Sequence, residues 1–264
     1  MLRVRNLTKI YDDGTEALTD VSFDVEDGEF LVVIGLSGSG KSTLLRCINR
    51  LIDPTEGTIH WDDQDITAAH AQELRAIRRN FGMIFQQFNL VKRSSVLTNV
   101  LAGRLGYVSP WSSILHRFPQ KDREAAYAAL RRVGISEQAQ KRASELSGGQ
   151  QQRVGIARAL MQEPKVILAD EPVASLDPVL AHTILGYLEQ LNQEDKMTVV
   201  CSLHYLDLVQ RYATRVIGLR DGEVVYEGSR EDIRKMTDEE FKEIYGEEAE
   251  RVSAAKRTVE EGNE

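Results

Sequence analysis

The stretch Gly35-Leu-Ser-Gly-Ser-Gly-Lys-Ser-Thr43 decides the fold, because it matches the pattern GxxxxGK[ST] in full. It follows an uninterrupted apolar run at 30–34 and precedes a segment, 41–49, whose pattern predicts a helix. Such an apolar run is typical of a strand buried on both faces of a parallel sheet. A glycine-rich turn between strand and helix directs backbone N–H groups and the positive helix end toward phosphate oxygens. The stretch therefore predicts an α/β fold with a phosphate site.

The side chains of this loop have separate expected roles. Lys41 is expected to reach the β- and γ-phosphates of a nucleotide, and Ser42 to hold Mg²⁺. An accidental glycine-rich turn is the alternative, and the flanking strand and helix argue against it. We therefore expect ATP and Mg²⁺ as cofactors. The loop residues expected to bind the nucleotide are Gly35, Ser37, Gly38, Ser39, Gly40, Lys41, Ser42 and Thr43.

A second apolar run, 166–169, ends in the acids Asp170 and Glu171. The carboxyl end of a parallel strand lies at the sheet edge where ligands bind. Asp170 is expected to coordinate Mg²⁺, directly or through water, and Glu171 to polarise an attacking water as general base. An apolar strand that ends in acids is common in α/β proteins. Together with the loop at 35–43, however, it predicts a site for nucleotide hydrolysis.

The pentapeptide Leu-Ser-Gly-Gly-Gln at 146–150 predicts a further helix N-terminus. Ser147 is a suitable N-cap, and the two glycines after it allow another chain or ligand to approach the backbone closely. Because a helix N-terminus attracts anions, this segment is a second candidate phosphate site. An ordinary capped helix after a loop is the alternative.

Length and composition exclude several classes of protein. The 264 residues predict one large domain or two small ones, and the net charge of −8 argues against a dedicated nucleic-acid binder. Two distant cysteines, Cys47 and Cys201, suggest neither a zinc site nor a disulfide framework. No apolar run approaches the roughly 20 residues of a membrane span, and the first residues lack a signal-peptide pattern. We therefore expect a protein that acts in the cytoplasm.

The motifs at 35–43, 146–150 and 166–171 together resemble those of the ATP-binding subunit of ABC transporters. The resemblance extends to about residue 232. It implies a P-loop NTPase (RecA-like) core with an N-terminal antiparallel β subdomain and an inserted α-helical subdomain. The implied domains are an ATP-binding core at 1–88 and 161–232, a helical signature subdomain at 89–160, and a C-terminal helix or tail at 233–264.

The resemblance also implies roles for four residues outside these motifs. Tyr11 lies where the family stacks an aromatic ring on adenine, and Asp177 lies in the segment that matches the family's D-loop. Gln86 matches the glutamine that senses Mg²⁺ and water, although Gln87 beside it leaves the register open. His204 matches the switch histidine that contacts the γ-phosphate. The implied catalytic residues are Glu171, His204 and Gln86, and the implied metal ligands are Ser42, Gln86 and Asp170.

The resemblance further implies a head-to-tail pair of two copies of the chain. ATP on the phosphate loop of one copy is then capped by Ser147, Gly149 and Gln150 of the other. The implied partners are a second copy, integral-membrane permease subunits and, through the permease, an extracytoplasmic substrate-binding protein. Nucleic acid is not among them. The implied location is the cytoplasmic face of the cell membrane.

One short segment makes the resemblance specific to a subfamily. Gly103-Arg-Leu-Gly-Tyr107, followed by Trp111, is similar to the phosphonate-import ATPases of this family, as are 169–175 and 217–222. The segment 101–119 is expected either to dock on a membrane subunit or only to pack a helical hairpin. The alternatives are the ATPase of another importer, for an amino acid or other anion, and a soluble ABC ATPase without a transport role. A small-molecule P-loop kinase would need an acceptor site and a lid in place of 146–150.

Overall fold

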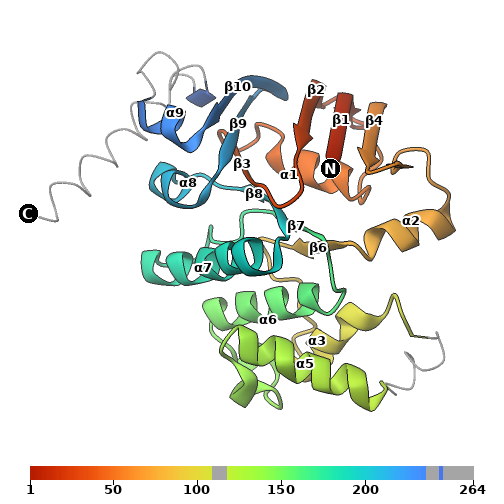
Figure 1. The fold of residues 1–264 in the computed structure, drawn as a ribbon, viewed down its shortest axis with the longest axis vertical. Coiled ribbons are helices and arrows are strands. Elements are labelled where there is room, and N and C mark those ends of the chain that lie inside the picture. The colour runs from red at the N-terminus through yellow and green to blue at the C-terminus, as the bar shows by residue number, and fades with distance from the viewer. Residues whose placement is uncertain (109–117, 236–243, 246–264) are drawn as a thin grey trace, which may run out of the picture.

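The computed structural model describes residues 1–108, 118–235, 244 and 245. Two sheets form its framework (Figure 1). The four-stranded sheet is antiparallel, in the order β2-β1-β4-β5. Its strands are β1 (Leu2–Ile10), β2 (Glu16–Val25), β4 (Glu56–Trp61) and β5 (Gln64–Asp65). Between β4 and β5 the chain turns at Asp62, whose φ is 52°.

The six-stranded sheet has the order β10-β9-β3-β8-β7-β6 and is parallel except at β10. Its strands are β3 (Phe30–Ile34), β6 (Phe81–Ile84), β7 (Val166–Ala169), β8 (Thr198–Ser202), β9 (Arg215–Arg220) and β10 (Glu223–Ser229). Along β3, Val32 packs into one hydrophobic cluster, and its neighbours Leu31 and Val33 pack into another. Successive side chains point to opposite faces, so this alternation explains why the strand is apolar throughout.

One group of helices lies at the bottom of the molecule in Figure 1, below the other helices and the sheets. The lower group comprises α3 (Val96–Leu101), α5 (Gln120–Arg132) and α6 (Gly148–Leu160), with 3₁₀ turns at Ala102–Arg104, Ser136–Gln138 and Ala143–Glu145. The remaining helices are α1 (Lys41–Ile48), α2 (Ala71–Arg78), α7 (Pro178–Asp195), α8 (Leu206–Tyr212) and α9 (Arg230–Lys235). Within the described residues, helices and turns but no strand lie between β6 and β7. The predicted fold class is confirmed, and the exact domain boundaries stay a prediction.

No helix in the described part of the chain combines the length and apolar character needed to cross a membrane. A hairpin turn at 220–223 joins β9 and β10, and both Asp221 and Gly222 have positive φ, as this tight turn requires. Beyond residue 232, Ile233, Ile244 and Tyr245 are buried against the larger hydrophobic cluster. The rest of the predicted C-terminal helix or tail lies outside the described residues.

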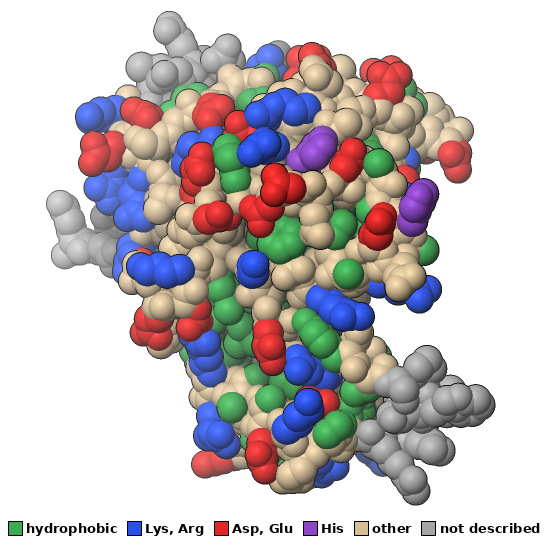
Figure 2. Space-filling view, turned by 45° about the vertical axis from the view of Figure 1, so that its right-hand side comes forward, with side chains coloured by type: hydrophobic (Ala, Val, Ile, Leu, Met, Phe, Trp, Pro, Cys, Tyr) green, Lys and Arg blue, Asp and Glu red, His purple; other side chains and the backbone are tan. Residues whose placement is uncertain are grey.

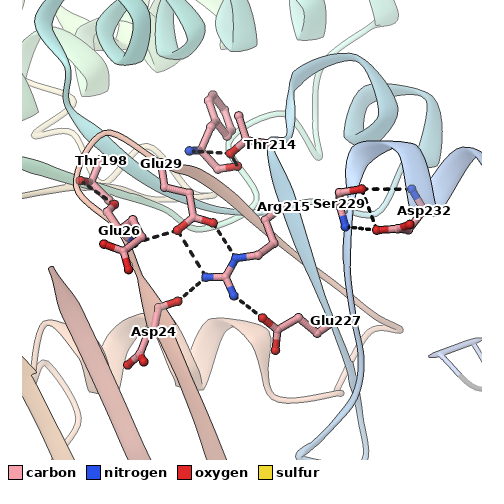
Figure 3. A network of polar contacts seen from close by, with 10 residues as sticks. Asp24, Glu26, Glu29, Thr198, Thr214, Arg215, Glu227, Ser229 and Asp232 are labelled. Carbon is pink, nitrogen blue, oxygen red and sulfur yellow. Dashed lines mark hydrogen bonds and ion pairs between the residues drawn. The ribbon is translucent and has the colours of Figure 1, made fainter.

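Arg215 joins the two sheets through a network of polar contacts (Figure 3). Its Nε donates to Oε1 of Glu29 at 2.6 Å, and other guanidinium nitrogens donate to Glu227 on β10 and to the carbonyl oxygen of Asp24 on β2. Burial opposes the charge, but the two carboxylates raise the pKa of Arg215 above its ordinary value. The guanidinium therefore holds the end of β2 against the first residue of β9.

Replacing Arg215 with methionine is expected to lower the free energy of unfolding by about 2 kcal/mol. The change leaves the carboxylate of Glu29, which is only 11% exposed, without its cation. Urea denaturation followed by circular dichroism measures the loss. The matched control is Arg211→Met, because Arg211 is 57% exposed in its ion pair with Glu189 and its loss should cost less than about 0.5 kcal/mol. Equal losses in the two variants would contradict this role of Arg215.

Candidate functional site

The phosphate loop, defined as residues 35–43, runs from the end of β3 into α1. Gly35 and Gly40 have φ values of 145° and 101°. A Cβ atom would lie 2.1 Å from the carbonyl oxygen of Leu219 at Gly35, and 2.4 Å from that of Ala17 at Gly40. Neither position has room for a side chain, because the backbones of β9 and β2 pack directly against the loop. Strands of both sheets therefore confine the loop at these two glycines.

Lys41 is the first residue of α1 and is buried. Its Nζ donates hydrogen bonds to the carbonyl oxygens of Gly35 at 2.9 Å and Leu36 at 2.7 Å. Burial lowers the pKa of Lys41 to about 8, and the nearby carboxylates of Glu171 and Asp170 oppose this only in part. The ammonium group thus lies inside the loop, where phosphate oxygens would favour its charged form.

Asp170, directly after β7, is the most buried acid of the site at 1% exposure. Its Oδ1 accepts a hydrogen bond from the Ser42 hydroxyl at 2.6 Å, and its Oδ2 pairs with the Arg46 guanidinium at 3.2 Å. Two of the three residues predicted as metal ligands, Ser42 and Asp170, are therefore in contact. A hydroxyl and a carboxylate oxygen are donors of the kind that Mg²⁺ prefers. Sequence reasoning missed Arg46, which lies one turn beyond Ser42 on α1.

Glu171 and His204 meet at the ends of neighbouring strands, β7 and β8. Nε2 of His204 lies 2.5 Å from Oε1 of Glu171. This hydrogen bond holds the pKa of Glu171 below its ordinary value, against the effect of burial, and the charges of His204 and Lys41 act in the same direction. The carboxylate is thus kept ionised, which is the form that a general base needs.

Tyr11 and Gln86 border the site from two other elements. The Tyr11 hydroxyl lies 3.1 Å from Oγ1 of Thr43, so its ring lies beside the start of α1. Gln86 follows β6, the strand paired with β7, and the backbone N–H of Asp170 donates to the carbonyl oxygen of Ile84 at 2.9 Å. Gln86 is exposed, and its side chain forms no hydrogen bond to the described residues. The pairing of β6 with β7 therefore places Gln86 near Asp170, but no hydrogen bond to the described residues fixes its side chain there.

The predicted second phosphate segment is built as a helix start. Ser147 caps α6 as expected: its Oγ accepts from the Gln150 N–H at 3.4 Å, and Oε1 of Gln150 accepts from the Ser147 N–H at 3.0 Å. Gly149 faces α7, since a Cβ there would lie 2.8 Å from Cδ1 of Leu180. Asp177 caps α7, with its Oδ1 accepting from the Leu180 N–H at 3.0 Å. Each group thus has a local structural role as well.

Ser147 and Asp177 are both exposed. Within the described part of the chain, no hydrogen bond or ion pair joins the segment 147–150 or Asp177 to the phosphate loop. The fold thus brings together the predicted residues of β3, α1, β7 and β8. It leaves Ser147 and Asp177 exposed at the surface, whereas Gly149 is buried against α7.

The string 103–107 packs against the end of α6. A Cβ at Gly103 would lie 2.1 Å from the carbonyl oxygen of Arg158. The Arg104 guanidinium pairs with Asp122 at 3.2 Å and stacks 4.2 Å from the ring centroid of Tyr107, whose hydroxyl donates to the carbonyl oxygen of Gln162 at 2.7 Å. The described part of the segment 101–119 therefore packs against the helical group, while Trp111 and Leu115 lie outside the described residues, so the choice between packing and docking stays a prediction.

Some apolar side chains nevertheless remain exposed, including Val91, Leu105 and Tyr107. Figure 2 shows hydrophobic side chains together with Lys and Arg side chains at the waist between the upper and lower parts of the molecule. Exposed apolar residues that are surrounded by charged ones are typical of a surface that binds another protein.

Comparison with known proteins places these features in a family. The family model for the ABC transporter matches residues 18–174. The chain is 56% identical to a phosphonates import ATP-binding protein, PhnC, of Shouchella clausii, over 93% of this chain and 91% of that protein. It is 54% identical to the PhnC of Bdellovibrio bacteriovorus, over 96% of both.

Solved structures agree with this similarity. A dimeric bacterial ABC transporter cassette aligns with a TM-score of 0.78 and 38% identity, over 87% of this chain and 99% of that one. A dimeric cassette in a post-hydrolysis state, bound to ADP and Pi, aligns with a TM-score of 0.76 and 37% identity over the same shares.

Nucleotide affinity is expected to fall as the pH rises above about 8, the pKa of Lys41 in the free chain. Bound phosphate favours the charged ammonium, so the complex holds a proton that free Lys41 has partly lost, and binding takes up a proton. Calorimetry near pH 8.5 in buffers of different ionisation enthalpy measures this uptake. Lys41→Arg, which keeps its charge, is the control and should show none. Equal uptake by both proteins would assign the proton to another group.

Proposed function

This chain belongs to the ABC transporter family, and we propose that it is the ATP-hydrolysing subunit of an importer for phosphonates, or for phosphite or phosphate esters. The proposed cargo is supported by the sequence identity of 50–56% to phosphonates import ATP-binding proteins, over more than nine-tenths of the chain. The cargo is inferred from these relatives, because the chemistry of the site concerns only the nucleotide.

The geometry of the site supports a separate role in ATP hydrolysis for each of its residues. Lys41 and the loop amides would bind the β- and γ-phosphates, and the Tyr11 ring would stack on the adenine. Glu171 would accept a proton from the attacking water, and His204, whose ring lies against that carboxylate, would contact the γ-phosphate. Gln86 would complete the contact to that water.

Mg²⁺ would be held by Ser42 and Asp170, with Gln86 close by. Bound there, it would neutralise charge on the phosphate oxygens. Within the described residues, no cluster of three or more His, Cys, Asp or Glu side chains could hold a metal by itself. This fits Mg²⁺, which commonly uses one or two protein oxygens together with substrate phosphates and water.

A second copy of the chain would complete the site. The exposed helix start at Ser147, with Gly149 and Gln150, would cap the γ-phosphate bound by the partner, and Asp177 would lie in the same interface. ATP would then stabilise the closed pair, and its hydrolysis would remove that preference. The exposure of Ser147 and Asp177 supports this arrangement, since both remain free to meet another chain.

The transporter would add separate membrane subunits. We place the chain at the cytoplasmic face of the cell membrane, bound to a permease that receives cargo from an extracytoplasmic binding protein. The exposed side chains of Val91, Leu105 and Tyr107 would lie in or beside the permease contact.

Uptake by the reconstituted transporter tests the cargo. Proteoliposomes that contain the chain, its permease and its binding protein are expected to accumulate methylphosphonate only with MgATP on the side of this chain. Inorganic phosphate and an amino acid are the comparison substrates. Transport of either one, with no transport of methylphosphonate or phosphite, would contradict the proposed cargo and leave the ATPase function standing.

Replacing Glu171 with glutamine is expected to lower ATP turnover by at least about a hundredfold, because the amide cannot accept the proton from water. ATP binding should persist, so an ATP-bound dimer should accumulate in size-exclusion chromatography. Lys41→Ala is the matched control, and it should weaken nucleotide binding itself and form no dimer. Brisk steady-state hydrolysis by Glu171→Gln would contradict the role of Glu171 as base.

A further inference from the structure

Ser202, the last residue of β8, is fully buried and contacts both acids of the site. Its Oγ accepts a hydrogen bond from the backbone N–H of Glu171 at 2.9 Å and donates one to Oδ1 of Asp170 at 3.4 Å. A hydroxyl carries one donor and two acceptor positions, so both bonds form at the same time. No motif in the sequence indicated this residue.

The backbone of Glu171 needs such a contact. Its φ is 46°, in the left-handed region that residues other than glycine rarely adopt. Residues in this region persist where the surrounding structure holds them, and they are frequent at functional sites. The bond to Ser202 fixes the N–H of Glu171, while His204 fixes its carboxylate.

The strand register explains why one serine reaches both acids. Ala169 on β7 pairs with Cys201 on β8, so the residues that follow them, Asp170 and Ser202, lie side by side at the sheet edge. His204 comes two residues after Ser202 on the same chain segment. One strand end therefore supplies the hydroxyl that holds the backbone of Glu171 and the histidine that holds its side chain.

We propose that Ser202 is a positioning residue for ATP hydrolysis. It sets the backbone of Glu171 so that the carboxylate stays against His204 and faces the attacking water. It also shares Oδ1 of Asp170 with Ser42, which orients that carboxylate for its metal. The proposal rests on the ATPase function proposed above and assigns Ser202 no direct contact with the nucleotide.

The test compares steady-state kinetics and nucleotide binding of full-length variants. Ser202→Ala is expected to lower kcat about tenfold, the rate equivalent of one buried hydrogen bond, with KM for ATP changed less than about twofold. The affinity for ADP without Mg²⁺, measured by calorimetry, should stay unchanged, because the phosphate loop is intact. Ser202→Thr keeps the hydroxyl and should recover most of the rate.

Thr198→Val is the matched control for a purely structural role. Thr198 begins the same strand, is buried, and its hydroxyl accepts from the Gly28 N–H at 2.9 Å, at the end of β8 away from the acids. Its loss should lower the melting temperature and leave kcat unchanged. Ser202→Cys keeps the side-chain volume but is a weak acceptor, so it should show the fall in kcat even if the alanine variant folds poorly.

A kcat for both Ser202→Ala and Ser202→Cys equal to that of the wild type would overturn the proposal. An equal fall in kcat in Thr198→Val would overturn it too, because the effect would then be general loosening of the strand. Absence of ATP hydrolysis by the wild-type chain with its transporter partners would instead overturn the proposed function, and this inference with it. The two failures are therefore distinguishable.

Discussion

The carboxylate of Asp170, at the end of β7, is only 1% exposed, and its burial requires compensating contacts from the residues around it. A buried charge is costly unless hydrogen bonds and an opposite charge compensate for it. Ser42 and Arg46 on α1 and Ser202 on β8 provide this compensation. The ends of three elements must therefore meet at one point. Because β3 leads into α1 through the phosphate loop, the same convergence brings Lys41, Glu171 and His204 together.

Sequence patterns were sufficient for the parts of this site that follow from local chemistry. The apolar runs at 30–34 and 166–169 predict buried parallel strands, and the two acids and the glycine-rich loop follow them directly. Ser147 is recognisable as an N-cap because its hydroxyl acts within its own helix turn. Tyr11, Gln86 and His204 carried no such local signal, and only the family resemblance singled them out.

Other features depend on contacts between distant segments, which one sequence does not reveal. Ser202 is an ordinary polar residue at the end of a strand until the register of β7 and β8 sets it beside Asp170. The roles of Arg46 and Arg215 were likewise not visible in the sequence, since their carboxylate partners come from other elements. Trp111 and Leu115 lie outside the described residues, so their docking role stays a prediction. The 103–107 string is a different case, because its packing was foreseen as one alternative and its partner, the end of α6, was not.

In the part of the chain that the structure describes, helix starts suited to phosphate lie at Lys41 and at Ser147, and the first of them meets the acids within one molecule. Two copies of the chain would therefore form composite ATP sites, and mixing two inactive variants tests this arrangement most directly. Lys41→Ala disables the phosphate loop and Ser147→Arg disables the cap, so each variant should be inactive on its own. A mixed dimer keeps one intact site, so we expect ATP hydrolysis to reappear on mixing. Full activity of Ser147→Arg alone, or no recovery in mixtures shown to contain the mixed dimer, would contradict it.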